Sequence, residues 1–320
     1  MSTKPIYKKY LALFAVGVLS AIAVGGSISV QAQTESQPTS APKFTEFKPG
    51  QTKISGNGNP FKPESLRQTE KPTGGRRGIP DGIDDRVPML SRDYPWSTIG
   101  RVEGTTTDAK QYHCTGTLIA DDIVLTNAHC VIDPETHQLS QKILFRPNVV
   151  NGAVSNRRDV AQAVQVIYGT NFTGNDYSNQ VNDWAVMKID KPLGRKYGYL
   201  GWKSLSPQTL LNYKEKLFFV GYSGDFPNPT KKGYEYLTAG PGYTAGFQAG
   251  CSIVKEEDNV LFHDCDTAGG SSGGPLIGVI DGQPYIVALN NAEIKNRRTN
   301  QDIINLAVKI SFLDELAGNR

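Results

Sequence analysis

The stretch Gly270–Pro275 reads Gly-Ser-Ser-Gly-Gly-Pro, and it decides how the rest of the chain is interpreted. A serine among glycines lets the backbone approach a substrate carbonyl closely, with amide N–H groups free to point at it. Ser271 is the alternative nucleophile, but only Ser272 has glycine two residues before and two residues after it. That spacing also fits the G-x-S-x-G turn of α/β-hydrolases, which need a histidine after the serine. No histidine follows Ser272, so that class of active enzyme is excluded.

A catalytic histidine must instead lie upstream of the serine. The chain has four histidines, His113, His129, His137 and His263, and His129 stands out because it closes a β-type run, at 125–130. A strand end holds a side chain on a rigid scaffold. We therefore expect His129 to be the catalytic base. The other three are expected to be non-catalytic, with His263 bordering a specificity pocket.

Asp183 is the candidate carboxylate, because it leads from polar sequence into the apolar run 184–188. A carboxylate in such a place can be half buried and still hydrogen-bonded. Asp176 and Asp190 lie nearby and are the alternatives. The order His, Asp, Ser along the chain is the order of chymotrypsin.

Short apolar runs recur through residues 78–320 and predict an all-β fold. Clusters of Gly, Pro, Asn and Asp separate them, and no long amphipathic helix interrupts them. Only the last segment looks helical, with Ser311 as its cap and Asp314 three residues on. About ten short strands at this spacing imply barrels or a sandwich. The runs are 114–120, 123–127, 162–168, 184–188, 217–222, 242–247, 259–263, 275–279, 285–289 and 304–310.

The first 32 residues are typical of an export signal. Three lysines precede an almost unbroken apolar stretch, 11–26, and Val30–Ala32 offers small residues at the two positions that a signal peptidase reads. We expect cleavage before Gln33. Because the apolar stretch is somewhat long, an uncleaved membrane anchor is the alternative. Either way the chain is exported, which favours oxidised cysteines.

Residues 33–77 are rich in Gln, Thr, Ser, Pro, Gly and Lys and show no apolar periodicity, so we expect them to be disordered. They end at the basic pair Arg76–Arg77, which suits a protease site, and they form either a propeptide or a linker. Residues 1–77 hold 11 basic and 4 acidic residues, a net +7, and the remaining 23 basic and 27 acidic residues give −4. The overall +3 is therefore no nucleic-acid footprint.

Several motifs in sequence order resemble the chymotrypsin-fold serine endopeptidases, most closely the bacterial V8-like (glutamyl endopeptidase) branch. The resemblance spans about residues 83 to 290 and implies two antiparallel six-stranded β-barrels (trypsin-like) with the site in the cleft between them. The protease domain would be 78–320. The motifs are Asp84–Arg86, Tyr94-Pro95, Cys114–Ile119, Thr126–Cys130, Asp183–Ala185 and Cys265–Thr267, which leads into Gly270–Pro275.

The resemblance also implies a role for each residue. Ser272 would attack the scissile carbonyl, His129 would accept its proton and pass it to the leaving amine, and Asp183 would hold the imidazole. The backbone N–H groups of Gly270 and Ser272 would form the oxyanion hole, worth roughly 3 kcal/mol per donor. No metal or organic cofactor is needed, and no two His or Cys residues have a metal-ligand spacing such as C-x-x-C.

Four cysteines allow three pairings. The resemblance implies that Cys114 bonds to Cys130 and that Cys251 bonds to Cys265. Trypsin-like zymogens carry an aspartate directly before the nucleophile, which pairs with a newly cut N-terminus. Ser271 stands at that place, so this ion pair is not available, although cleavage after Arg76 or Arg77 remains the expected activation of a V8-like propeptide.

The specificity pocket is expected at Asp266, Thr267 and Asn290. Asp266 lies where trypsin-like enzymes bind Arg or Lys, and Thr267 matches a hydroxyl residue that helps glutamyl endopeptidases bind Glu. The pocket histidine of those enzymes is missing from 285–291. A preference for Glu/Asp or for Arg/Lys before the scissile bond therefore stays open, and 289–291 is expected to pair with the substrate backbone.

Three other classes of protein share parts of this pattern. A catalytically silent binding module would lack a triad residue, and none is missing. An HtrA-type protease needs a PDZ domain, for which the 48 residues after Ser272 leave no room. A membrane- or wall-tethered processing protease is the remaining alternative. We expect a secreted or periplasmic monomer that cleaves proteins or peptides, with no nucleic-acid partner and no stable membrane span after signal cleavage.

Overall fold

The computed structural model describes residues 41–69, 84–133, 136–169, 172, 177–295, 298 and 302–318. All of them lie in one compact unit, Thr39–Arg320. The predicted signal segment, the basic pair Arg76–Arg77 and the alternative carboxylate Asp176 lie outside the described residues. Within them, no helix is long and apolar enough to cross a membrane.

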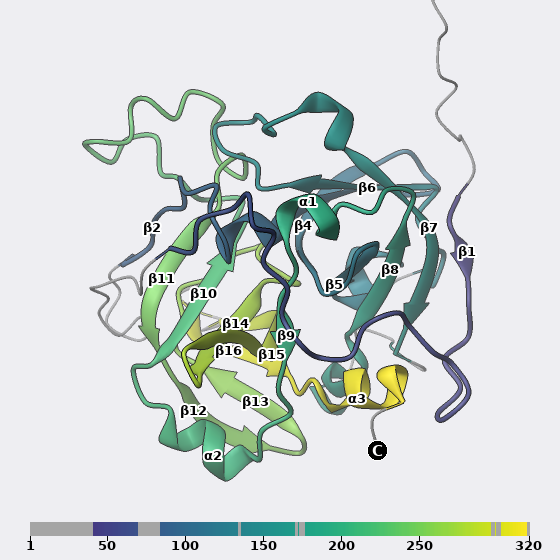
Figure 1. Ribbon diagram of the computed structural model, residues 1–320. Coiled ribbons are helices and arrows are strands. Elements are labelled where there is room, and N and C mark those ends of the chain that lie inside the picture. Colours follow the sequence, from purple (N-terminus) through teal and green to yellow (C-terminus); the bar gives the residue numbers. More distant parts are fainter. Residues whose placement is uncertain are drawn as a thin grey trace, which may run out of the picture. The chain divides into compact units, whose positions relative to one another are not determined.

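Six antiparallel strands close into a first barrel (Figure 1). Neighbours pair in the order β6-β3-β4-β5-β8, and β7 closes the ring because it pairs with both β6 and β8. Inward-facing side chains such as Val102, Val124 and Phe145 fill the interior, and each contributes about 1.5–3 kcal/mol by burial. The strands are β3 (Ile99–Thr105), β4 (Gln111–Leu118), β5 (Ile123–Thr126), β6 (Lys142–Pro147), β7 (Ala161–Tyr168) and β8 (Ala185–Ile189).

The second sheet runs in the order β12-β13-β16-β15-β14-β10-β11. Only Ser252 separates β11 from β12, so the two ends of this sheet are halves of one bent strand and the sheet curls into a second barrel. The predicted trypsin-like fold of two barrels is confirmed. The strands are β10 (Leu217–Gly221), β11 (Gly246–Cys251), β12 (Ile253–Glu257), β13 (Val260–His263), β14 (Pro275–Ile280), β15 (Gln283–Lys295) and β16 (Asp302–Val308), with short β2 (Val87–Pro88) on β11 and β9 (Gly201–Trp202) on β15.

The predicted C-terminal helix is present as α3 (Ser311–Ala317). Its Phe312 stacks on Trp184 with 4.2 Å between ring centroids, which joins it to a core cluster shared by both barrels. The predicted cap is wrong: Ser311 is the first helical residue, and no side chain caps the helix. The other helices are short: α1 (Gly194–Tyr197), α2 (Pro207–Asn212), η1 (Trp96–Thr98), η2 (Ala128–Cys130), η3 (Arg157–Asp159) and η4 (Tyr177–Asn182).

Residues 41–69 contradict the expectation of disorder for this part of 33–77. We call this segment the strap; it begins with β1 (Lys43–Phe44), which pairs in parallel with β7. It then crosses toward the second barrel, where Ile54 donates its N–H to the Leu316 carbonyl and Phe61 pairs with Tyr199 (Figure 1). The strap has no hydrophobic core of its own. Its few apolar side chains, such as Phe47, Ile54 and Leu66, pack singly against the core of the barrels, and its composition is therefore like that of a disordered segment.

Candidate active site

The first barrel supplies a histidine–aspartate pair. His129 lies in η2 at the end of β5, and Asp183 follows η4 just before β8, which is the neighbour of β5 in the sheet. The His129 Nδ1–H donates to Asp183 Oδ2 at 2.8 Å, and the His129 backbone N–H donates to Oδ1 at 3.1 Å. The Asn127 side chain holds the Asp183 carbonyl at 2.6 Å. These bonds fix the ring so that Nε2 is the free nitrogen.

The environment of this pair favours the protonated imidazole. Burial by itself lowers the pKa of His129, but the charge of Asp183 and its hydrogen bond outweigh burial, so the pKa lies above its usual 6.5. Asp183 is 1% exposed, and its charge therefore acts through a medium that screens it little. The alternative carboxylate Asp190 instead accepts the Gln162 N–H and has no contact with His129.

The second barrel supplies Ser272, in the loop before β14. Its hydroxyl donates to the Asn291 carbonyl at 3.2 Å, and its own carbonyl accepts the Thr115 N–H at 2.8 Å. No hydrogen bond joins Ser272 to His129 among the described residues, as is common in unliganded sites of this kind. Ser271 is 2% exposed and donates its hydroxyl to the Ala268 carbonyl at 2.7 Å, so it is poorly placed to be a nucleophile.

The serine loop leaves two amides unused. Ser271, Gly273 and Gly274 donate their backbone N–H groups within the protein, whereas those of Gly270 and Ser272 meet no acceptor in the described part of the chain. Gly270 has φ +97°, and a side chain there would overlap His113 and the Tyr222 carbonyl. Glycine is therefore required at this position of the turn.

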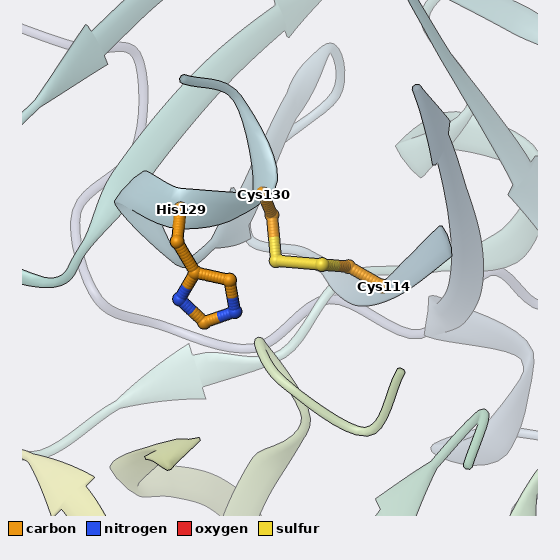
Figure 2. Close-up of side chains that lie close together, drawn as sticks. All are labelled: Cys114, His129 and Cys130. Carbon is orange, nitrogen blue, oxygen red and sulfur yellow. A yellow bond between two sulfur atoms is a disulfide. The ribbon is translucent and has the colours of Figure 1, made fainter. Parts of the chain in front are cut away.

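A disulfide lies between the two parts of the site. Cys114 on β4 bonds to Cys130 beside His129, as predicted (Figure 2). Cys251 bonds to Cys265, also as predicted. The Cys130 sulfur is 3.8 Å from the Ser272 carbonyl oxygen and within 4.8 Å of a His129 nitrogen. The histidine and the serine loop are thus neighbours. Because both sulfurs are bonded to each other, this His-Cys-Cys cluster offers no thiolate to a metal ion.

The predicted pocket residue Asp266 makes its hydrogen bonds inside the protein. Asp266 accepts the Asp85 N–H at 2.9 Å and a Gln248 side-chain N–H at 3.2 Å. Burial, helped by the charges of Asp84 and Asp85, raises the pKa of Asp266 to about 6. Thr267 is 6% exposed beside it. Nothing in the sequence indicated that the Asp85 backbone, 181 positions away, donates to this carboxylate.

Asn290 belongs to a buried chain of hydrogen bonds. The Cys265 N–H donates to His263 Nδ1, His263 Nε2–H donates to Asn290 Oδ1, and the Asn290 amide donates to the Ser271 carbonyl at 3.1 Å. His263 is fully buried, so it does not border an open pocket. His137 is exposed, and a ring nitrogen of His113 is 2.9 Å from the Tyr222 carbonyl.

The family description Trypsin-like peptidase domain matches residues 114–288, more than half of the chain. The chain belongs to this family. Among curated relatives of this trypsin-like peptidase, serine protease 23 of Rattus norvegicus is 25% identical over 218 residues, and that of Homo sapiens 26%. Each alignment covers 60% of this chain and 49% of the relative, so the chain spans about half the length of the curated relatives it matches.

Solved structures share the trypsin-like fold. A Glu endopeptidase superposes with a TM-score of 0.56 at 23% identity, over 73% of this chain and 96% of its own. The protease Anisep from Arthrobacter nicotinovorans superposes with a TM-score of 0.53 at 18% identity, over 71% and 98%. The predicted resemblance to chymotrypsin-fold serine proteases is therefore confirmed at the level of the fold.

Proposed function

We propose that this protein is a serine endopeptidase in which His129, Asp183 and Ser272 form the catalytic triad. The observation that carries the proposal is the 2.8 Å His129–Asp183 hydrogen bond. It lies next to a serine loop in which the backbone N–H groups of Gly270 and Ser272 have no acceptor among the described residues. The trypsin-like family supports the reaction class. All three triad residue types are present, which sets the enzyme apart from a silent binding module.

Acylation would begin with attack of the Ser272 hydroxyl oxygen on the scissile carbonyl carbon. His129 Nε2 takes the hydroxyl proton, and the amides of Gly270 and Ser272 donate to the carbonyl oxygen as it becomes negative. His129 then gives the proton to the amine as the C–N bond breaks. Asp183 stabilises the imidazolium throughout, since its carboxylate stays hydrogen-bonded to Nδ1.

Deacylation would repeat these steps with water. His129 takes a proton from the water as its oxygen attacks the acyl carbon, and returns it to Ser272 Oγ when the ester bond breaks. The products are a carboxylic acid and the regenerated hydroxyl. No step requires a metal or an organic cofactor.

The residue before the scissile bond is proposed to be charged, either Glu/Asp or Arg/Lys. Arg/Lys recognition would use the Asp266 carboxylate, which must then exchange the Asp85 N–H for the substrate. Recognition of Glu would use the Thr267 hydroxyl. Any histidine that helped to bind the Glu side chain would have to come from outside 285–291, because that segment contains none. Leu289–Asn291 is proposed to pair with the substrate backbone.

The enzyme is proposed to act outside the cell or in the periplasm, as a monomer on protein or peptide substrates. Residues 1–32 would be the signal peptide and Arg76–Arg77 a processing site. Two buried disulfides support an oxidising compartment. Cell fractionation separates release from tethering: a tethered protease stays with the membrane or wall fraction.

A proteome-derived peptide digest, read by mass spectrometry, tests the activity and the specificity together. Wild type should cut next to charged residues, and cleavage after Glu/Asp or after Arg/Lys decides between the two preferences. Ser272→Ala should cut nothing, while Ser271→Ala, a substitution in the neighbouring buried serine, should still cut. Persistent cleavage by Ser272→Ala would refute the nucleophile.

A further inference from the structure

The outer face of the first barrel holds a cavity of about 340 Å³ that the proposed chemistry does not use. Its wall carries Arg101 from β3 and Lys142 and Arg146 from β6, against one carboxylate, Glu103, within the described residues. Burial and the charge of Arg101 lower the pKa of His113 on the same wall, so this imidazole is neutral. The wall therefore has an excess of positive charge.

Strand register brings these charges together. Arg101 lies directly opposite Arg146 across β3 and β6, and like charges in such pairs destabilise a sheet. Glu103 reaches both: its Oε1 is 2.8 Å from Arg146 Nη1 and 3.3 Å from Arg101 Nη1. One carboxylate therefore forms ion pairs with two guanidinium groups and neutralises only one of their two positive charges.

Arg101 is the buried member of the set. It is 7% exposed, and the Tyr243 ring covers its guanidinium at 4.3 Å. Within the part of the chain that the structure describes, Arg101 Nε and Nη1 have no hydrogen-bond acceptor. Glu103 is close enough to Arg101 for an ion pair, but these two nitrogens make no hydrogen bond to it. Buried nitrogens without a hydrogen bond are unfavourable, and an anion in the cavity would offset that cost. Arginine forks suit carboxylate and phosphate groups.

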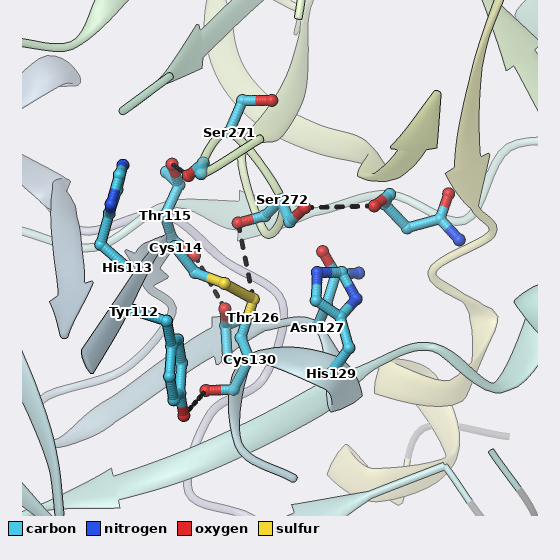
Figure 3. Close-up of a disulfide and its surroundings, with 12 residues drawn as sticks. Tyr112, His113, Cys114, Thr115, Thr126, Asn127, His129, Cys130, Ser271 and Ser272 are labelled. Atoms are coloured by element: carbon cyan, nitrogen blue, oxygen red, sulfur yellow. Dashed lines mark hydrogen bonds between the residues drawn. A yellow bond between two sulfur atoms is a disulfide. The ribbon is translucent and has the colours of Figure 1, made fainter. Parts of the chain in front are cut away.

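The cavity adjoins the active site through β4. His113 lines the cavity and lies against Gly270 of the serine loop. Two residues on, Thr115 donates its N–H to the Ser272 carbonyl and its hydroxyl to the Gly270 carbonyl (Figure 3). Ser272 therefore lies between β4 and Asn291 of β15, which accepts its hydroxyl.

We propose that this cavity binds an acidic side chain of the substrate that follows the scissile bond. The inference rests on the proposed function: a peptide whose acyl part pairs with β15 passes Ser272 and continues over β4 toward the cavity. There an Asp or Glu carboxylate is placed among Arg101, Lys142 and Arg146. The peptidase then prefers substrates with an acidic residue shortly after the cut.

A degenerate peptide library with Glu and Gln in equal amounts tests this. After digestion by wild type, Glu should exceed Gln about fivefold at one position after the cut, the ratio for roughly 1 kcal/mol. Lys142→Gln/Arg146→Gln should bring the ratio close to 1. Lys142→Glu changes only the exposed lysine and leaves Arg101 and Arg146 in place, and it should favour Gln. Lys255→Gln on β12 is the matched control and should keep the wild-type ratio.

Equal ratios in wild type and in these variants would overturn the proposal. Capture of the same library by immobilised Ser272→Ala protein reads binding without turnover. Glu enrichment there, with no cleavage by wild type, would uphold the cavity and refute the proposed peptidase. Inorganic phosphate gives a further readout, the Tm of wild type and of the double variant. If phosphate raises only the wild-type Tm, and wild type cleaves Glu and Gln peptides equally well, the cavity binds free anions and the substrate assignment is wrong.

Discussion

At the scale of single residues, Asp183 sets both the orientation and the basicity of His129. The carboxylate fixes the tautomer that leaves Nε2 free and raises the pKa of the imidazole above 6.5. A base works only when it is neutral, so kcat/KM should fall as the pH drops through that pKa. The acid limb of the pH profile is therefore expected above pH 6.5.

Asp183→Asn tests this coupling. The amide can no longer stabilise the imidazolium and favours the wrong tautomer, so kcat should fall by about 10⁴. The acid limb should also move to lower pH, because the opposing charge is gone. Asp190→Asn is the matched control, since its carboxylate bonds to Gln162 instead. A loss of rate in Asp183→Asn with no shift of the limb would contradict the assigned role.

His263 should govern part of the acid stability. Burial lowers its pKa to about 4, whereas the unfolded chain titrates near 6.5. Between these values the unfolded state binds more protons, so the stabilisation is complete above pH 6.5 and is lost as the pH falls toward 4, by roughly 3 kcal/mol. Urea unfolding at several pH values should show a flatter pH dependence for His263→Gln than for His137→Gln. Equal slopes would exclude this role.

At the scale of elements, the strap is the part of the chain most in need of a test. Ile54 packs on the shared core, and its N–H bonds to the Leu316 carbonyl. Ile54→Ala should lower the free energy of unfolding by about 1–2 kcal/mol, less than for a fully buried site. Gln51→Ala, an exposed neighbour, should change it little. Chemical denaturation measures both, and an unchanged midpoint for Ile54→Ala would mean that the strap is not part of the folded unit.

Strand prediction succeeded where apolar runs are dense. The runs 123–127, 217–222 and 275–279 match β5, β10 and β14 to within one residue. The run 242–247 is wrong in its boundaries, because β11 begins only at Gly246. The sequence did not predict β3. Its Arg101 and Glu103 face the cavity on the outer face of the first barrel, so the strand shows no continuous apolar run.

Local motifs are enough to nominate His129, Asp183 and Ser272 as the candidate site residues. The long-range contacts around them have no such motif. The cysteine pairs follow from family resemblance. The contact of Asp85 with Asp266 joins positions 181 apart, and the Asn290–His263 bond joins β15 to β13 across the intervening strand β16. Such contacts arise from barrel closure, for which no single window of sequence carries a signal.

At the scale of the whole molecule, the strap changes what processing would produce. If the chain is cut after Arg77, residues 41–69 should stay bound, because backbone bonds tie them to β7, Tyr94 and Leu316. Active enzyme from the culture medium should then show two N-termini that co-elute on size exclusion. A mature enzyme that lacks the strap, or that begins at Gln33 in one uncut chain, would contradict this processing.

The central claim is that Ser272 is a nucleophile activated by His129. Labelling with a fluorophosphonate followed by mass spectrometry tests it most directly, because the reagent reports the activated serine itself. We predict one adduct per chain, on Ser272, that persists in Ser271→Ala and disappears in Ser272→Ala and in His129→Ala. An adduct on Ser271, or peptide cleavage by a protein whose Ser272 stays unlabelled, would contradict the account.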